Sequence, residues 1–167
     1  PEFGDVVKAA ADAFGDELNE KQIVDLFQHE FIDFEGRYKL LERRFDYSDV
    51  KASGEGNHTT FTGEVAVDGK RYQIEGEGNG PIDAFFQALK QVGIDGYEFI
   101  DYDEHAITGG SNAQAICYIH LRRPDGRPIY GVGIHSGIVV ASLLGIICAI
   151  NRAESETARH TVYVPEP

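Results

Sequence analysis

A glycine-rich stretch in the middle of the chain has the composition of an anion-binding turn. The segment "EGEGNGPIDAFFQAL", Glu75 to Leu89, places three glycines, an asparagine and a proline directly before an apolar run. Glycine lets a ligand approach the backbone, and free N–H groups at a helix N-terminus favour negative charge. The segment contains no Lys or Arg, so it suits a carboxylate better than a polyphosphate. The alternative is an ordinary turn in which Gly78 and Gly80 take positive φ and Asn79 or Gly80 lies near the cap.

Carboxylate and histidine side chains gather in "IDYDEHAITGG", which contains Asp101, Asp103, Glu104 and His105. These residue types are common metal ligands, so a small metal-dependent hydrolase is one hypothesis. On a strand, alternation sends Asp101, Asp103 and His105 to one face, which equally suits a solvated surface. The following "GGSNAQA" contributes small residues, which fit either an ordinary hairpin or room for a ligand side chain; they are Gly109, Gly110, Ala113 and Ala115.

The composition restricts the function classes. The chain has 167 residues and a formal net charge of −13, which argues against nucleic-acid partners because these need clustered cations. Cys117 and Cys148 lie in apolar runs, which predicts buried thiols in a reducing compartment. The apolar run Ile138 to Ile150 is too short to span a bilayer, and no secretory signal opens the sequence. We therefore expect a cytoplasmic protein that has no membrane partner.

The elements that would position these residues follow from periodicity. Residues 1–35 predict two helices, Asp5 to Phe14 and a second one capped by Asn19 with Gln22 completing a capping box. From about Arg37 the apolar period changes to two, which predicts three strands, the last two joined at Asp68-Gly69. Pro81 suits the first turn of a helix that runs to about Val92, and Gly93 suits its end.

The pattern of three strands and a helix then occurs a second time. Shifting the chain by 57 residues aligns Gly76, Gly80 and Ala84 with Gly133, Gly137 and Ala141. The predicted fold class is therefore α+β, with two pseudo-symmetric βββα units formed by internal duplication. The predicted second-unit helix, Ser136 to Ala153, is apolar nearly all round, which indicates burial on several sides and a second subunit.

Four motifs in order carry a resemblance to a known family. The stretches "GEGNGPIDAFFQAL", "IDYDEHA", "NAQAICYI" and "YGVGIHSGIVVASLLGIICAINRA" resemble the C-terminal regulatory domain of 2-isopropylmalate synthase, roughly from Tyr38 to Ala153. On this basis residues 1–35 resemble a helical linker, 36–153 form the regulatory domain with repeats at about 38–93 and 97–153, and 154–167 form a flexible tail. The segment 109–112 falls where the family varies.

The resemblance implies a homodimer that binds L-leucine as a feedback effector. It carries over effector-binding positions that lie at the helix entrance and on the neighbouring strands; these are Gly78, Asn79, Gly80, Pro81, Ile82, Asp83, Tyr102, Ala106, Ala113 and Ala115. The family's catalytic TIM barrel makes 2-isopropylmalate from acetyl-CoA and 2-oxoisovalerate with a divalent metal. That barrel is missing from these 167 residues, so we expect no catalytic residue, metal or cofactor in the chain itself.

Two further readings stay open on sequence grounds. The isoleucine-sensing regulatory domain of citramalate synthase belongs to the same class, and one methyl position in a tight pocket is worth about 1–3 kcal/mol. The other is a structural dimerisation module with an empty pocket.

Overall fold

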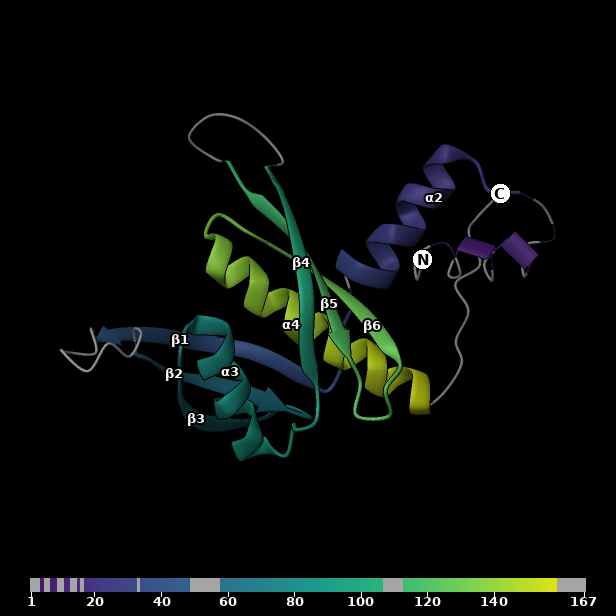
Figure 1. Cartoon of the computed structure of the whole chain (residues 1–167). Coiled ribbons are helices and arrows are strands. Elements are labelled where there is room, and N and C mark those ends of the chain that lie inside the picture. Colours follow the sequence, from purple (N-terminus) through teal and green to yellow (C-terminus); the bar gives the residue numbers. More distant parts are fainter. Residues whose placement is uncertain are drawn as a thin grey trace.

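The computed structural model describes residues 17–32, 34–48, 58–106 and 113–158, with isolated positions before residue 17. Its elements follow one another in the order α2 (Glu20–Phe27), a π-helical turn (Gln28–Ile32), β1 (Tyr38–Ser48), β2 (His58–Val67), β3 (Lys70–Gly78), α3 (Pro81–Leu89), a 3₁₀ turn (Lys90–Val92), β4 (Glu98–Ala106), β5 (Ala115–Arg122), β6 (Pro128–His135) and α4 (Ile138–Ala158). The strands form two three-stranded sheets. Figure 1 shows the sheets with their helices, and α2 to one side.

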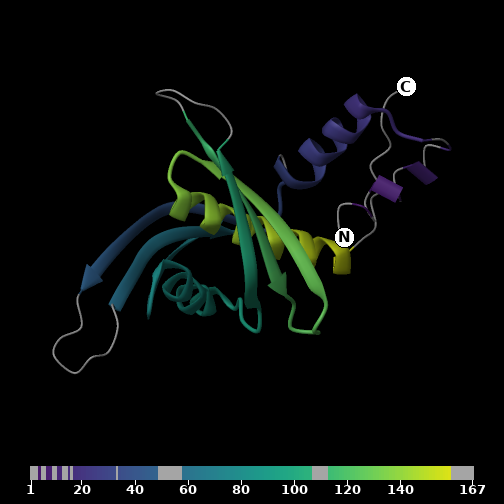
Figure 2. The ribbon, with the colours of Figure 1, turned by 45° about the horizontal axis from the view of Figure 1, so that its top comes forward.

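Each half of the chain is an antiparallel meander followed by a helix. The sheets have the orders β1-β2-β3 and β4-β5-β6, α3 packs on β3 and β2, and α4 packs on β6 and β5. One hydrophobic core runs through both halves, and α3 also contacts α4. The second view, Figure 2, shows the two sheets and both helices forming a single body. The predicted α+β fold of two βββα units is confirmed.

The duplication is visible in how closely each helix approaches its sheet. A Cβ on Gly76 would lie 2.3 Å from the Ala88 backbone N, and a Cβ on Gly133 would lie 1.9 Å from the Ala141 carbonyl O. The first strand of each unit also carries an irregularity near its start, at Leu41 in β1 and at Ile100 in β4. Both units therefore depend on a bare glycine backbone under the helix.

Three local signals in the sequence were confirmed: the capping box of α2, the hairpin at Gly69 and the helix end at Gly93. Asn19 and Gln22 form the predicted capping box of α2, with both hydrogen bonds at 2.9 Å. Gly69 and Gly93 have φ of 84° and 81°, as a tight hairpin and a helix end require. The predicted helix Asp5 to Phe14 and the loop 109–112 lie largely or wholly outside the described residues.

The helix α4 is longer than predicted and ends at Ala158. Its window Ile138–Ser155 is long and apolar enough to cross a membrane by length and composition, but 67% of that window is buried inside the fold. The sheet of its own unit and α3 cover it, so much of the burial that suggested a second subunit arises within one chain. Ile138 in its first turn is exposed.

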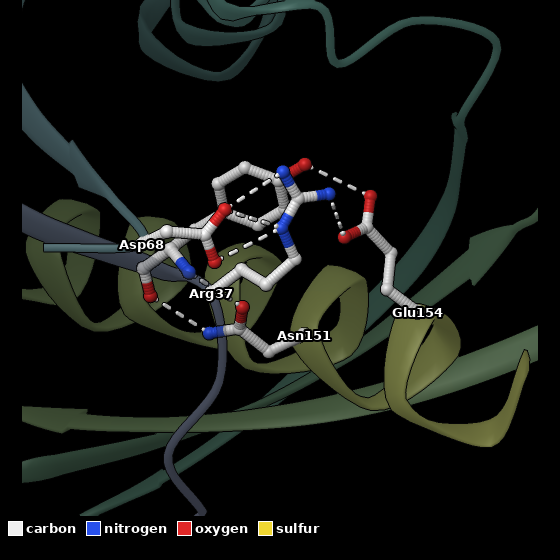
Figure 3. Close-up of polar contacts among 5 residues, drawn as sticks. Arg37, Asp68, Asn151 and Glu154 are labelled. Carbon is white, nitrogen blue, oxygen red and sulfur yellow. Dashed lines mark hydrogen bonds and ion pairs between the residues drawn. The ribbon is translucent and has the colours of Figure 1, made fainter. Parts of the chain in front are cut away.

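The last turns of α4 join the second unit to the start of the first (Figure 3). The buried amide of Asn151 accepts from the Tyr38 N–H at 2.9 Å and donates to the Tyr38 carbonyl at 2.8 Å. Glu154 accepts from the Tyr38 hydroxyl at 2.9 Å and pairs with Arg37 at 3.2 Å, and Arg37 also pairs with Asp68 at 3.1 Å. Burial and the Glu154 carboxylate raise the pKa of Tyr38 to about 12, so this hydroxyl stays protonated as a donor.

Candidate functional site

The entrance to α3, residues 78–83, exposes backbone donors. Gly80 is the N-cap residue and provides no side-chain cap, and its carbonyl accepts from the Ala84 N–H at 2.9 Å. Pro81 has no N–H, so the N–H groups of Ile82 and Asp83 are the first donors of the helix. Neither is hydrogen-bonded within the described part of the chain. An anion can therefore bind at this end of the helix.

The glycines of the entrance work differently from the sequence-based interpretation. The prediction of positive φ at Gly78 and Gly80 was wrong. Gly80 is extended, with φ of −168°, and Gly78 is not among the described glycines that have positive φ. Those glycines are Gly15, Gly69, Gly93, Gly96 and Gly126. Gly78 is needed for close contact, because a Cβ there would lie 2.3 Å from Asp83 Oδ2. A Cβ on Gly80 would meet no atom within 4 Å, so the space beside it is open.

Asp83 is engaged in holding the turn. Its Oδ2 accepts from the Asn79 N–H at 3.0 Å, and its Oδ1 accepts from Gln87 at 3.5 Å. The carboxylate therefore fixes the conformation of the entrance and is already used as an acceptor. A positively charged ligand group near it would have to share the carboxylate or use a backbone carbonyl.

A pocket of about 590 Å³ lies between α3 and the start of β4. Ile82 and Asp83 from the entrance line it, and so does Phe99 from β4. The other lining residues are Phe86, Gln87, Lys90, Ile94, Asp95, Gly96, Tyr97 and Glu98. This volume is typical of a small-molecule site, and its walls combine apolar rings with a few polar groups. Phe86 lies within the predicted helix, whereas Tyr97 and Phe99 come from the segment that leads into β4 and from β4 itself, so their place in the pocket depends on tertiary packing.

The strand residues of the predicted site share one sheet face. Tyr102 pairs with Ile119 and Ala106 pairs with Ala115, so their side chains point to the face that α4 covers. The Tyr102 ring lies 6.2 Å from that of Phe99, which places Tyr102 next to the pocket. Ala106 and Ala115 do not line the pocket and lie at the far end of the β4–β5 hairpin, which runs away from α3 in Figure 1. The exposed Ala113 lies two residues before the start of β5.

One chain therefore brings together only part of the predicted site. The six entrance residues and Tyr102 lie near the pocket. Ala115 lies beside the second helix entrance, residues 135–140, because it pairs with His135, and Ala106 pairs with Ala115 from the other side. Four residues along a strand correspond to about 13 Å, so Tyr102 and Ala106 are too far apart to contact the same small ligand closely.

The carboxylate and histidine cluster does not form a metal site within the described residues. No group of three His, Cys, Asp or Glu side chains there is placed to hold a metal ion. Asp103 and His105 approach to 3.7 Å on an exposed strand, and the His105 ring packs edge-on against Tyr118 at 5.8 Å. The solvated-face interpretation of this strand is the better one. The two cysteines are free and buried, as predicted.

A second pocket repeats the position of the first. It measures about 530 Å³ and lies between α4, the start of β1 and β6, with the segment before β1 forming one wall. Gln87 and Lys90 of the first pocket correspond, 57 residues on, to Leu144 and Ile147 of the second. The duplication therefore extends to the cavities, although the second entrance differs because the Gly137 N–H donates to His135 Nδ1 at 2.9 Å.

Comparison with known families agrees with this architecture. The profile of the LeuA allosteric (dimerisation) domain matches residues 17–154, which include α2 and both βββα units. The chain belongs to this family. The matched range of this LeuA dimerisation domain therefore covers the two sheets, both helix entrances and the segment that packs on α4.

Three relatives are similar over most of the chain, and each is named 2-isopropylmalate synthase. The protein of Clostridium acetobutylicum is 37% identical over 154 residues, which are 92% of this chain and 27% of that protein. The protein of Corynebacterium efficiens is 38% identical over 152 residues, 91% of this chain and 25% of its own length. The protein of Rhodospirillum rubrum is 35% identical over 150 residues, which are 90% of this chain and 26% of that protein. The chain thus spans about a quarter of the length of these relatives.

Proposed function

We propose that this LeuA domain binds leucine and acts as the feedback-sensing part of a 2-isopropylmalate synthase. The observation that carries the proposal is the uncapped entrance of α3, whose residues Ile82 and Asp83 line a pocket with aromatic walls. An amino acid has the matching chemistry, because its carboxylate suits the helix N-terminus and its side chain suits the apolar wall.

In the proposed binding mode, the leucine carboxylate accepts hydrogen bonds from the entrance N–H groups. Asp83 is already bonded to Asn79 and Gln87, so a backbone carbonyl is the preferred acceptor for the ammonium group. The isobutyl group lies against Phe99 and Tyr102. Gly80 leaves open space on the side from which the carboxylate would approach.

We further propose that a homodimer completes the site. All of β4 except Phe99 is exposed, including Ile100 at 36% and Tyr102 at 48%, and Ile138 at the start of α4 is exposed at 39%. Exposed apolar side chains on an edge strand suit a protein interface. A second copy can place its Ala106, Ala113 and Ala115 against the pocket of the first, which would unite the two groups of predicted site residues.

The wider context of the domain is also a proposal. The segment before β1 would lead to a catalytic barrel that condenses acetyl-CoA with 2-oxoisovalerate, and any divalent metal would belong to that barrel. The domain itself would need no cofactor. We place the whole protein in the cytoplasm, as befits a biosynthetic enzyme.

Calorimetric titration of the purified chain with leucine tests the proposal. We expect saturable binding and a rise in melting temperature, because a ligand at about 100 times its Kd adds about 2.7 kcal/mol to the free energy of unfolding. Isoleucine is expected to bind about tenfold more weakly or worse, since a displaced methyl group costs about 1–3 kcal/mol.

Other outcomes of the titration favour other functions. Tighter binding of isoleucine would assign the domain to a citramalate synthase type of sensor. No heat of binding at millimolar concentrations of either amino acid, for a folded dimer, would leave a structural dimerisation module. Stoichiometric zinc or manganese in protein purified without chelators would revive the hydrolase hypothesis.

A further inference from the structure

The segment that precedes β1 is held by one arginine of α4. Arg152 is 3% exposed, and its guanidinium lies over the Phe31 ring at 4.1 Å. The same group donates to the Tyr130 carbonyl of β6 and lies 3.7 Å from the Glu30 carboxylate, which is 20% exposed. A single buried cation thus contacts the second sheet and the π-helical turn that follows α2.

Neighbouring side chains reinforce this contact from both sides. The Cys148 thiol, one turn earlier on α4, donates to the Phe31 carbonyl at 3.4 Å. The Phe27 ring stacks on Phe31 at 5.1 Å and lies 6.4 Å from Tyr118 of β5. The end of α2 and the turn after it are therefore seated on the second unit, although they lead directly into the first.

The same half of α4 also holds the next residues of the chain. Asn151 pairs with both backbone groups of Tyr38, and Glu154 binds Arg37 and the Tyr38 hydroxyl, as Figure 3 shows. The side chain of Asn151 also lies against Gly36, where a Cβ would approach it to 2.5 Å. The last turns of α4 thus contact Glu30, Phe31, Gly36, Arg37 and Tyr38.

We propose that the C-terminal half of α4 is a clamp that fixes the direction in which the segment 17–36 leaves the domain, and that Arg152 is its positioning residue. Cys148, Asn151 and Glu154 are its other members. Its regulatory meaning rests on the proposed function. The start of α4 lies beside Cys117 on the strand that begins at Ala115, since the Cys117 thiol donates to the Ile138 carbonyl at 3.8 Å and lies 3.6 Å from the Ser142 hydroxyl. A rigid helix would then join the wall of the proposed dimeric site to the segment leading to the barrel.

Hydrogen exchange of the 167-residue chain tests the clamp directly. In the variant Arg152→Met the apolar volume is kept but the guanidinium is lost. We expect amides of residues 26–36 to exchange at least about tenfold faster than in the parent, because breaking a buried charge contact frees the segment locally. Amides of β2, β3 and α3 should exchange at parent rates. Glu30→Gln, which alters the partner on the segment itself, should accelerate exchange in the same residues to a smaller degree.

Two comparisons separate positioning from general destabilisation. Arg122→Met removes an exposed arginine that pairs with Glu98 at 2.8 Å, and it should leave residues 26–36 protected. Arg152→Lys should restore part of the protection, since it keeps the charge. Unchanged exchange at 26–36 in both Arg152→Met and Glu30→Gln, or faster exchange spread evenly over the whole chain, would overturn the proposal.

The same hydrogen-exchange experiment, repeated with leucine, tests whether the clamp couples the leucine site to the segment 26–36. If the parent binds leucine, Arg152→Met should retain the affinity within about twofold, because Arg152 does not line the pocket at the α3 entrance. Leucine should change exchange at 26–36 in the parent and not in the variant, and an equal change in both would overturn the clamp as a route of coupling. If the parent does not bind leucine, the proposed function fails, whereas the exchange difference between parent and variant still decides whether Arg152 seats the segment.

Discussion

Replacing Gly133 with alanine is expected to destabilise the domain by about 3 kcal/mol, at the top of the usual range for overpacking. The added Cβ would lie 1.9 Å from the Ala141 carbonyl O and 2.6 Å from the Gly145 N, so β6 and α4 would have to separate. Backbone atoms cannot rotate out of the way as a flexible side chain can. A loss of this size corresponds to a fall in melting temperature of roughly 6–12 °C for a chain of this length, which calorimetry or circular dichroism would measure.

The matched control is Gly137→Ala, four residues further on at the second helix entrance. Its Cβ would meet the nearest atom, His135 Nδ1, at an ordinary distance of 3.5 Å. We expect a cost of no more than about 1 kcal/mol, which is the usual difference between cap residues. If the two variants melt at the same temperature, the close approach of strand and helix is not what requires glycine at 133.

Replacing Ala115 with leucine is expected to abolish or strongly weaken leucine binding while the chain stays folded. Ala115 is only half-buried in one chain, so a larger side chain can be accommodated in the monomer. In the proposed dimer it fills the space meant for the ligand. An overpacked site costs about 1–3 kcal/mol, which is a loss of affinity of about fivefold to 150-fold.

Titration calorimetry of the variant measures this loss, with His105→Leu as control. His105 pairs with Ile116 and lies on the opposite face of the same hairpin, so its replacement should leave the affinity for leucine unchanged. Parent affinity in the Ala115→Leu variant would mean that the hairpin alanines do not form the pocket wall. The entrance of α3 could then still be the site, completed by Phe99 and Tyr102 within one chain.

Features encoded by neighbouring residues could be read from the sequence. The capping box of Asn19 and Gln22 and the hairpin at Asp68-Gly69 depend on a few consecutive residues, and the structure confirms both. The duplication was visible because glycines under the helices must recur at the same spacing in each copy. The α+β class with two βββα units followed from these local patterns.

Features that depend on packing between distant residues could not be read in the same way. A glycine can serve positive φ or close approach, and residue type alone does not distinguish them, which is why the interpretation of Gly78 was wrong. The pairing of Asn151 with Tyr38 joins residues that are 113 positions apart, and no pattern in the neighbouring residues of either one predicts it. The separation of Tyr102 from Ala106 and Ala115 depends on how far the hairpin extends beyond α3.

Amide chemical-shift mapping by NMR during a leucine titration tests the central claim most directly. The chain contains its own control, because the second helix entrance at 135–140 occupies the equivalent place in the second unit but has different hydrogen bonds. We expect the largest shifts at Gly80, Ile82 and Asp83, with smaller ones at Phe99 and Tyr102, and little change at Val139 and Val140. Saturable shifts confined to the second entrance, or none at millimolar leucine, would contradict the claim that the entrance of α3 is an amino-acid site.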